Sequence, residues 1–117
     1  MIRVSDLVEW ILKNRKGTAF RGYSEEKIIC EVVEGLENET MSYSLDASGQ
    51  ITGVVCGTKD ASKKVFYCHD ILVTKKGIVK DMMRVFMSLY PDYTIEGINK
   101  NGRFRQFKNP EKLTKRL

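Results

Sequence analysis

The sequence predicts an α/β protein (α+β in strict terms) with a mostly antiparallel central sheet and helices on both of its faces. Three observations indicate this class. Two stretches near the N-terminus repeat apolar residues at helical spacing. Three consecutive stretches in the middle of the chain have strand-like apolar patterns. A strand, a glycine loop, a helix and another strand then follow, an order that implies a crossover connection and one parallel pairing.

Length and composition predict one globular domain over residues 1–117. A chain of 117 residues can bury a single core, and its 42% hydrophobic and 30% charged content are ordinary for a soluble protein. No apolar run approaches the roughly 20 residues that span a membrane, and the N-terminal stretch lacks a signal-peptide pattern. We therefore expect a cytoplasmic protein with no membrane partner. Three cysteines without a CxxC pair, and one histidine, predict neither a disulfide framework nor a metal site.

The charge is distributed unevenly along the chain. Residues 1–58 hold six Lys or Arg and nine Asp or Glu, whereas residues 59–117 hold fourteen and six. The C-terminal half is therefore strongly basic, and from about residue 100 the chain forms a basic tail. This asymmetry indicates a polyanionic partner or an anionic cofactor, or else a basic tail that is simply solvated.

Two amphipathic helices are expected before the strands. Ser5 is the expected N-cap of the first helix, which ends at Gly17, and Ser24 is the expected N-cap of the second, which ends near Asn38. Their apolar stripes consist of Val4, Leu7, Val8, Ile11 and Leu12 in the first helix and Ile28, Ile29, Val32, Val33 and Leu36 in the second.

Three strands are expected to form an antiparallel meander. They are Met41–Leu45, Ile51–Thr58 and Val65–Val73, and the third is apolar on both faces, as in a strand that is covered on both sides. The second strand contains Gly53 and Gly57, which often mark a bulge or a close approach of two chains. A helix follows the meander, and a fourth strand is expected from Thr94 to Ile98.

A basic glycine loop, Thr74–Gly77, joins the third strand to the helix that follows it. The helix repeats apolar residues on one stripe that includes Ile78, Met82 and Phe86. The first-turn amides of a helix are unpaired and its dipole favours negative charge, so this loop can hold a phosphate. The alternative is a tight strand-to-helix turn with solvated lysines.

This order of elements resembles the core of the GNAT N-acetyltransferase fold over roughly residues 24–108. The family's pyrophosphate motif, Q/R-x-x-G-x-G/A, aligns with the run that begins at Thr74, and Gly77 matches its central glycine. Thr74 replaces the Gln/Arg and Val79 replaces the last small residue. The resemblance implies acetyl-CoA as cofactor and an amine as acceptor. The implied cofactor-binding residues are Thr74, Lys75, Lys76, Gly77, Ile78 and Val79.

A second patch is similar to the family's N-x-x-A-x-x-[FL]-Y pattern. It begins at Asn101, and the tyrosine that commonly serves as general acid falls at Lys108. Small size and a basic tail look similar to GNAT-like proteins encoded by bacteriophages, several of which are virion or accessory components. Two functions follow: an N-acetyltransferase, or a catalytically inactive phage structural or accessory protein. In the second case the location is the host cytoplasm or the virion.

His69 and Tyr67 are the candidate catalytic residues. Acetyl transfer to an amine needs a base, and His69 and Asp70 on the third strand are the base candidates. Adjacent strand residues point to opposite faces, so His69 and Asp70 are not expected to act as a pair. Tyr67 shares the face of His69 and supplies a hydroxyl. The alternatives are a hydrogen-bonded structural histidine and a core tyrosine.

The basic tail has two interpretations. Arg103, Arg105 and Lys108 alternate with Phe104 and Phe107, a pattern that suits contacts with nucleic-acid phosphates and bases, or with a phage or host protein. Alternatively, the two phenylalanines anchor the tail to the core while the charges stay solvated. The two interpretations are compatible.

Overall fold

The computed structural model describes residues 2–75, 77–98 and 104–107, and for Ala19, Ile98 and residues 104–107 it describes the backbone only. The elements follow one another as helices α1 (Val4–Asn14), η1 (Ala19–Gly22) and α2 (Glu25–Glu37), strands β1 (Met41–Leu45), β2 (Ile51–Asp60) and β3 (Val65–Val73), helix α3 (Ile78–Leu89), and strands β4 (Thr94–Ile98) and β5 (Phe104–Phe107). The predicted α+β class is confirmed.

The strands form one mixed sheet in the order β1-β2-β3-β4-β5. The pairs β1–β2 and β2–β3 are antiparallel, which confirms the predicted meander. Helix α3 crosses over to β4, which pairs with β3 in parallel, as the strand–helix–strand order predicted. Strand β5 pairs antiparallel with β4 and was not predicted, because Phe104 and Phe107 are three residues apart and do not alternate as strand residues do.

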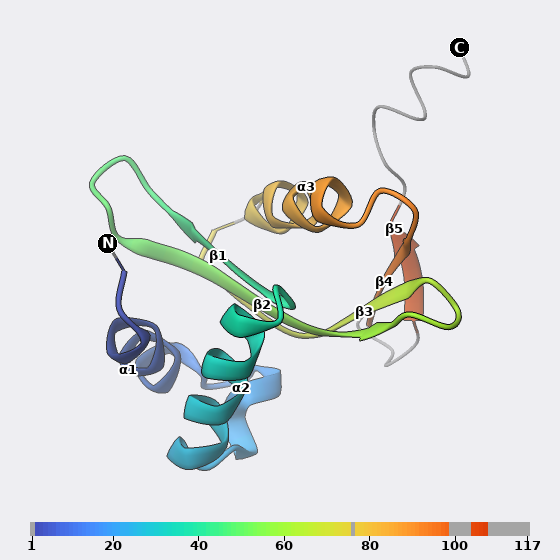
Figure 1. The fold of residues 1–117 in the computed structure, drawn as a ribbon. Coiled ribbons are helices and arrows are strands. Elements are labelled where there is room, and N and C mark those ends of the chain that lie inside the picture. The colour runs from blue at the N-terminus through green and yellow to red at the C-terminus, as the bar shows by residue number, and fades with distance from the viewer. Residues whose placement is uncertain (1, 76, 99–103, 108–117) are drawn as a thin grey trace.

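Helices cover both faces of the sheet (Figure 1), with α1 and α2 on one face and α3 on the other. Each face has its own apolar core. The core under α1 and α2 includes Leu7, Ile11, Phe20, Ile28, Val32, Val54 and Leu72. The core under α3 includes Val55, Phe66, Cys68, Met82, Met83, Phe86 and Ile95.

The two N-terminal helices differ in how closely they follow the prediction. Ser24 caps α2 as expected, because its Oγ accepts a hydrogen bond from the backbone N–H of Lys27 at 3.1 Å. Helix α1 begins earlier than expected, with Arg3 rather than Ser5 at the N-cap. The Asp6 carboxylate accepts from the Arg3 N–H at 2.9 Å, so an acidic residue in the first turn satisfies this backbone donor at the helix end.

Candidate functional site

A β-bulge in β3 creates the candidate site. Cys56 of β2 lies opposite Asp70, but the next residue, Gly57, lies opposite Cys68, so His69 is an extra residue in β3. The bulge reverses the alternation of the strand. Phe66 and Cys68, before it, pack in the core under α3, whereas Leu72, after it, packs in the core under α1 and α2.

The bulge brings His69 and Asp70 together, which corrects the sequence-based expectation that neighbouring strand residues would point apart. His69 Nδ1 lies 3.2 Å from Asp70 Oδ2. On its other side, His69 Nε2 lies 3.0 Å from the Thr58 hydroxyl. Thr58, His69 and Asp70 therefore form a hydroxyl–imidazole–carboxylate chain, the connectivity that orients a histidine for general acid–base chemistry.

Tyr23 completes the surroundings of Asp70 from a distant part of the chain. Its hydroxyl donates to Asp70 Oδ1 at 3.0 Å and approaches Oδ2 at 3.2 Å. Tyr23 follows η1, whose residue Phe20 is fully buried and fixes this loop against the sheet. Asp70 is only 2% exposed, so these donors replace water around its carboxylate.

The cluster shifts the pKa of each of its members. Burial alone would raise the pKa of Asp70, but the hydrogen bonds from His69, Glu31 and Tyr23 outweigh it and hold this pKa below its ordinary value. The hydrogen bond to Asp70 raises the pKa of His69, although burial opposes it. Burial and the neighbouring Asp70 charge raise the pKa of Tyr23 to about 12, so its phenol stays a donor at neutral pH. An anionic Asp70 thus favours the imidazolium that a general base becomes.

Tyr67, the second predicted catalytic residue, stands two residues before His69 on β3. Alternation from Phe66 and Cys68 puts Tyr67 on the face of the sheet that also holds His69. It lies opposite Thr58 on β2 and opposite Glu96 on β4, and its side chain is half-buried. Its catalytic role remains a prediction.

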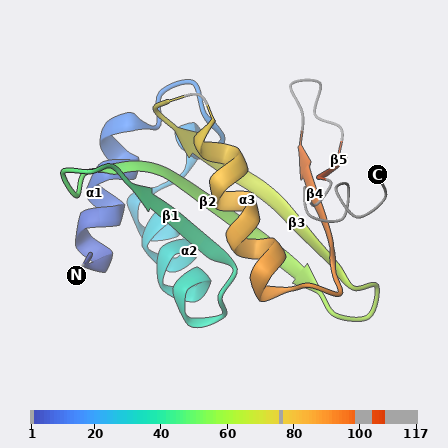
Figure 2. The ribbon, with the colours of Figure 1, turned by 90° about the horizontal axis from the view of Figure 1, so that it is seen from above.

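Strand β4 leaves β3 at the bulge. The parallel pairing runs from Val65 opposite Thr94 to Cys68 opposite Gly97. The pairing with β3 does not extend to Ile98, the next residue of β4, whereas the other edge of β4 pairs with β5 from Ile95 to Ile98. Figure 2 shows β4 diverging from β3 beyond this point. Within the described residues, the edge of β3 from 69 to 73 that faces β4 therefore has no strand partner.

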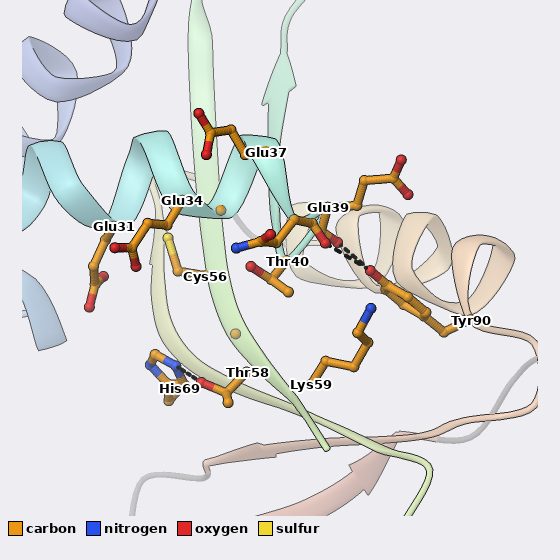
Figure 3. A pocket seen from close by; sticks show the side chains of 13 residues that line it. Glu31, Glu34, Glu37, Glu39, Thr40, Cys56, Thr58, Lys59, His69 and Tyr90 are labelled. Carbon is orange, nitrogen blue, oxygen red and sulfur yellow. Dashed lines mark hydrogen bonds between the residues drawn. The ribbon is translucent and has the colours of Figure 1, made fainter. Parts of the chain in front are cut away.

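A groove of about 660 Å³ opens beside His69 (Figure 3). The C-terminal half of α2 and the segment after it form one wall, and β2 forms the floor. The lining residues are Glu31, Glu34, Gly35, Glu37, Asn38, Glu39, Thr40, Cys56, Gly57, Thr58, Lys59, His69 and Tyr90. At the far end, the hydroxyl of Tyr90 donates to the backbone oxygen of Glu39 at 2.9 Å.

The groove is acidic. Glu34, Glu37 and Glu39 are exposed on its wall, and none of them forms an ion pair with another described residue. Sequence reasoning missed this wall. The signal was present, since Glu31, Glu34 and Glu37 recur every three residues and so lie along one side of a helix. Such a wall attracts a positively charged ligand.

The predicted anion loop lies at the end of β3. Both the backbone N–H and the hydroxyl of Thr74 donate to the carbonyl of Thr52, at 3.0 and 3.1 Å, so Thr74 ties the loop to β2. Gly77 is the N-cap of α3 with a left-handed φ of 88°, and no atom lies within 4 Å of where its Cβ would be. Val79 packs against the core under α3. Lys75 is exposed, and Lys76 lies outside the described residues.

Several predicted partner residues fall outside the described part of the chain. Arg103 and Lys108 are among them, and Arg105 lies in β5 with only its backbone described. Their role in binding nucleic acid or a protein stays a prediction. None of the helices in the described part has the length and hydropathy of a membrane span.

The three cysteines are free, and the sheet separates two of them. Cys56 packs in the core under α1 and α2, and Cys68 packs in the core under α3. Cys30 is exposed on α2. Among residues 2–75, 77–98 and 104–107, no group of three or more His, Cys, Asp or Glu side chains could hold a metal ion.

Comparison of the chain with models of known protein families, with curated protein sequences and with solved structures finds no match. The site is therefore defined by the chain's own residues. It consists of a histidine at a bulge, held by a buried carboxylate, between an open strand edge and an acidic groove.

Proposed function

We propose that the chain is a GNAT-like N-acetyltransferase that moves an acetyl group from acetyl-CoA to a positively charged amine. The observation that carries this function is the β3 bulge, which pairs His69 with Asp70 where β4 leaves β3. The order of helices and strands, and the parallel crossover through α3, further support a GNAT-like arrangement.

In this proposal His69 acts as the general base. An alkyl amine with an ordinary pKa of about 10.4 is protonated at neutral pH and must lose a proton before it can attack a thioester. His69 Nε2 faces the Thr58 hydroxyl at the groove, so it can take this proton directly or through Thr58 Oγ1. Asp70 holds the opposite nitrogen and stabilises the imidazolium that results.

The residues present fit acetyl-CoA, whose thioester supplies the activated acetyl group. The open edge of β3 after Cys68 offers backbone donors and acceptors to the amide groups of the pantetheine arm. The first-turn amides of α3, at Ile78, Val79 and Lys80, would hold the pyrophosphate with help from the exposed Lys75. The inward packing of Val79 keeps this helix end clear.

The acidic groove supports a cationic acceptor. Glu34, Glu37 and Glu39 lie on its wall, and His69 lies at one end. A linear diamine or triamine, or a lysine side chain, would place one ammonium group beside these carboxylates and a second amine at His69. Because exposed charges are screened by salt, we expect the apparent KM for such an amine to rise with ionic strength.

Two measurements test this function. Mass spectrometry of a triamine incubated with acetyl-CoA should detect the acetylated product, and His69→Gln should lower the rate about 10²–10⁴-fold while acetyl-CoA binding is retained. In calorimetric titrations, Lys80→Glu should weaken acetyl-CoA binding, because it puts a negative charge in the first turn of α3. Lys63→Glu, at another exposed lysine in the turn before β3, is the matched control and should bind normally.

The outcomes separate the two functions. Acetyl-CoA binding that is equally strong in wild type, Lys80→Glu and Lys63→Glu would contradict the proposed coenzyme site. The absence of any binding at millimolar acetyl-CoA would refute the acetyltransferase and favour the non-enzymatic accessory protein.

A further inference from the structure

Glu31 on α2 has a buried carboxyl oxygen with no apparent partner. Its Oε2 is inaccessible to solvent and has no hydrogen-bond donor among the described residues. Its neighbour is the Asp70 carboxyl, which already accepts from Tyr23 and His69. Two carboxylates are both acceptors, so they can bond to each other only when a proton lies between them. The orphaned oxygen therefore indicates a protonated Glu31 that donates to Asp70.

The surroundings of Glu31 agree with this proton. Burial, together with the hydrogen bond to Asp70, raises the pKa of Glu31 to about 7. Lys27, one helical turn earlier on α2, opposes this shift by favouring the ionised carboxyl. Glu31 therefore changes its charge near neutral pH, and the pKa of the neighbouring His69 is also raised.

We propose that Glu31 is a positioning residue that controls His69 through Asp70. As a neutral acid it donates to Asp70 and leaves His69 free to accept a proton, and as a carboxylate it adds a second negative charge that holds a proton on His69. The cluster can thus keep one proton on Glu31 or on His69, and the two groups titrate together. The consequence for catalysis rests on the acetyl transfer proposed above, but the proton coupling does not.

The other charged and titratable groups around His69 include Tyr23, Cys56, Asp70 and Lys27. Tyr23, after η1, stays neutral at pH 7, and the burial of Cys56 on β2 raises the pKa of its thiol, which also stays neutral. Asp70 is the constant negative charge. Lys27 on α2, whose Nζ lies 4.0 Å from the centre of the Tyr23 ring, disfavours the imidazolium. Glu31 is therefore the group beside His69 whose charge changes near neutral pH.

The chain offers a clean probe, because His69 is its only histidine. Proton NMR of the imidazole Cε1–H should give one titrating resonance. We expect Glu31→Gln to lower the midpoint of this titration by about one pH unit and to make the curve a single step. Glu34→Gln, one turn further along α2 and exposed, removes the same charge and should change the midpoint by less than about 0.3 unit.

A second variant keeps the test possible if Glu31→Gln does not fold. Glu31→Asp keeps an ionisable carboxyl but shortens the side chain, which withdraws the carboxyl from Asp70, so the His69 titration should become a single step. A His69 titration that is identical in wild type, Glu31→Gln and Glu31→Asp, with all three proteins folded, would overturn the coupling. A shifted midpoint without any acetyl transfer would leave the coupling intact and remove the proposed activity. With activity present, the acid limb of the kcat/KM profile should move to lower pH in Glu31→Gln.

Discussion

Gly57 is the position where a single methyl group should do most harm to the candidate site. It lies beside the bulge, opposite Cys68, and a Cβ placed on it would overlap the Phe66 ring and would lie 2.5 Å from the backbone carbonyl of Tyr67. The ring can shift only into a core that is filled by Phe86, and the carbonyl belongs to the strand itself. Moving either the Phe66 ring or the Tyr67 carbonyl would therefore destabilise the fold.

The magnitude follows from two opposing effects. Overpacking a filled core costs about 1–3 kcal/mol, and contact with backbone puts this site in the upper part of that range. Replacing glycine within a strand returns roughly 0.5–1 kcal/mol of backbone entropy. The net expectation for Gly57→Ala is a loss of about 2 kcal/mol in the free energy of unfolding, or roughly 8 °C in the melting temperature.

Urea and thermal unfolding, followed by circular dichroism, measure this loss. Gly22→Ala is the control, because no heavy atom lies within 4 Å of its Cβ position and its φ is not left-handed. It should remain within about 0.5 kcal/mol of wild type. The His69 resonance should move in Gly57→Ala and stay in place in Gly22→Ala. Equal stability of Gly57→Ala and wild type would show that the close approach at the bulge is wrong.

Two further predictions concern titration and thiols. Glu31 and His69 have raised pKa values, so they lose their contribution to stability as pH rises through those values, whereas Asp70 has a lowered pKa and loses its contribution as pH falls. Wild type should therefore lose stability relative to Glu31→Gln in urea titrations as pH rises from 4.5 through about 7, and a constant difference would contradict this. Burial raises the pKa of Cys68 to about 12 and that of Cys56 as well, so a disulfide reagent should modify Cys30 quickly and the other two thiols only on unfolding. Rapid modification of all three in the folded protein would contradict the separate cores.

Periodic patterns were enough to predict the framework of the fold. The strands of the meander alternate or are apolar on both faces, and the stripe of α3 repeats at helical spacing, so their types and order follow from local sequence. The bulge in β3 could not be predicted from such a periodic pattern. Because β3 has apolar residues on both faces, a one-residue slip at His69 changes which core each residue enters without changing the pattern.

The candidate site was predictable only in part for the same reason. His69 could be singled out as the only histidine, and Gly57 was a hint of a bulge or close approach. The contacts of Tyr23 and Glu31 with Asp70 gave no signal, because the two residues reach Asp70 from positions 47 and 39 residues away. Such contacts depend on how helices dock on the sheet, which local periodicity does not encode.

Tyr90 connects the core under α3 with the segment that follows α2 and forms part of the acidic wall. Its ring lies 5.3 Å from that of Phe66, which in turn stacks on Phe86 at 4.4 Å, so three aromatic rings run outward from the core under α3. Its hydroxyl holds the carbonyls of Asn38 and Glu39, just after α2. Displacement of the C-terminal end of α3 would therefore pull on the acidic wall across the sheet. A ligand that restricted the motion of α3 would therefore also affect the acidic wall, where the amine is proposed to bind.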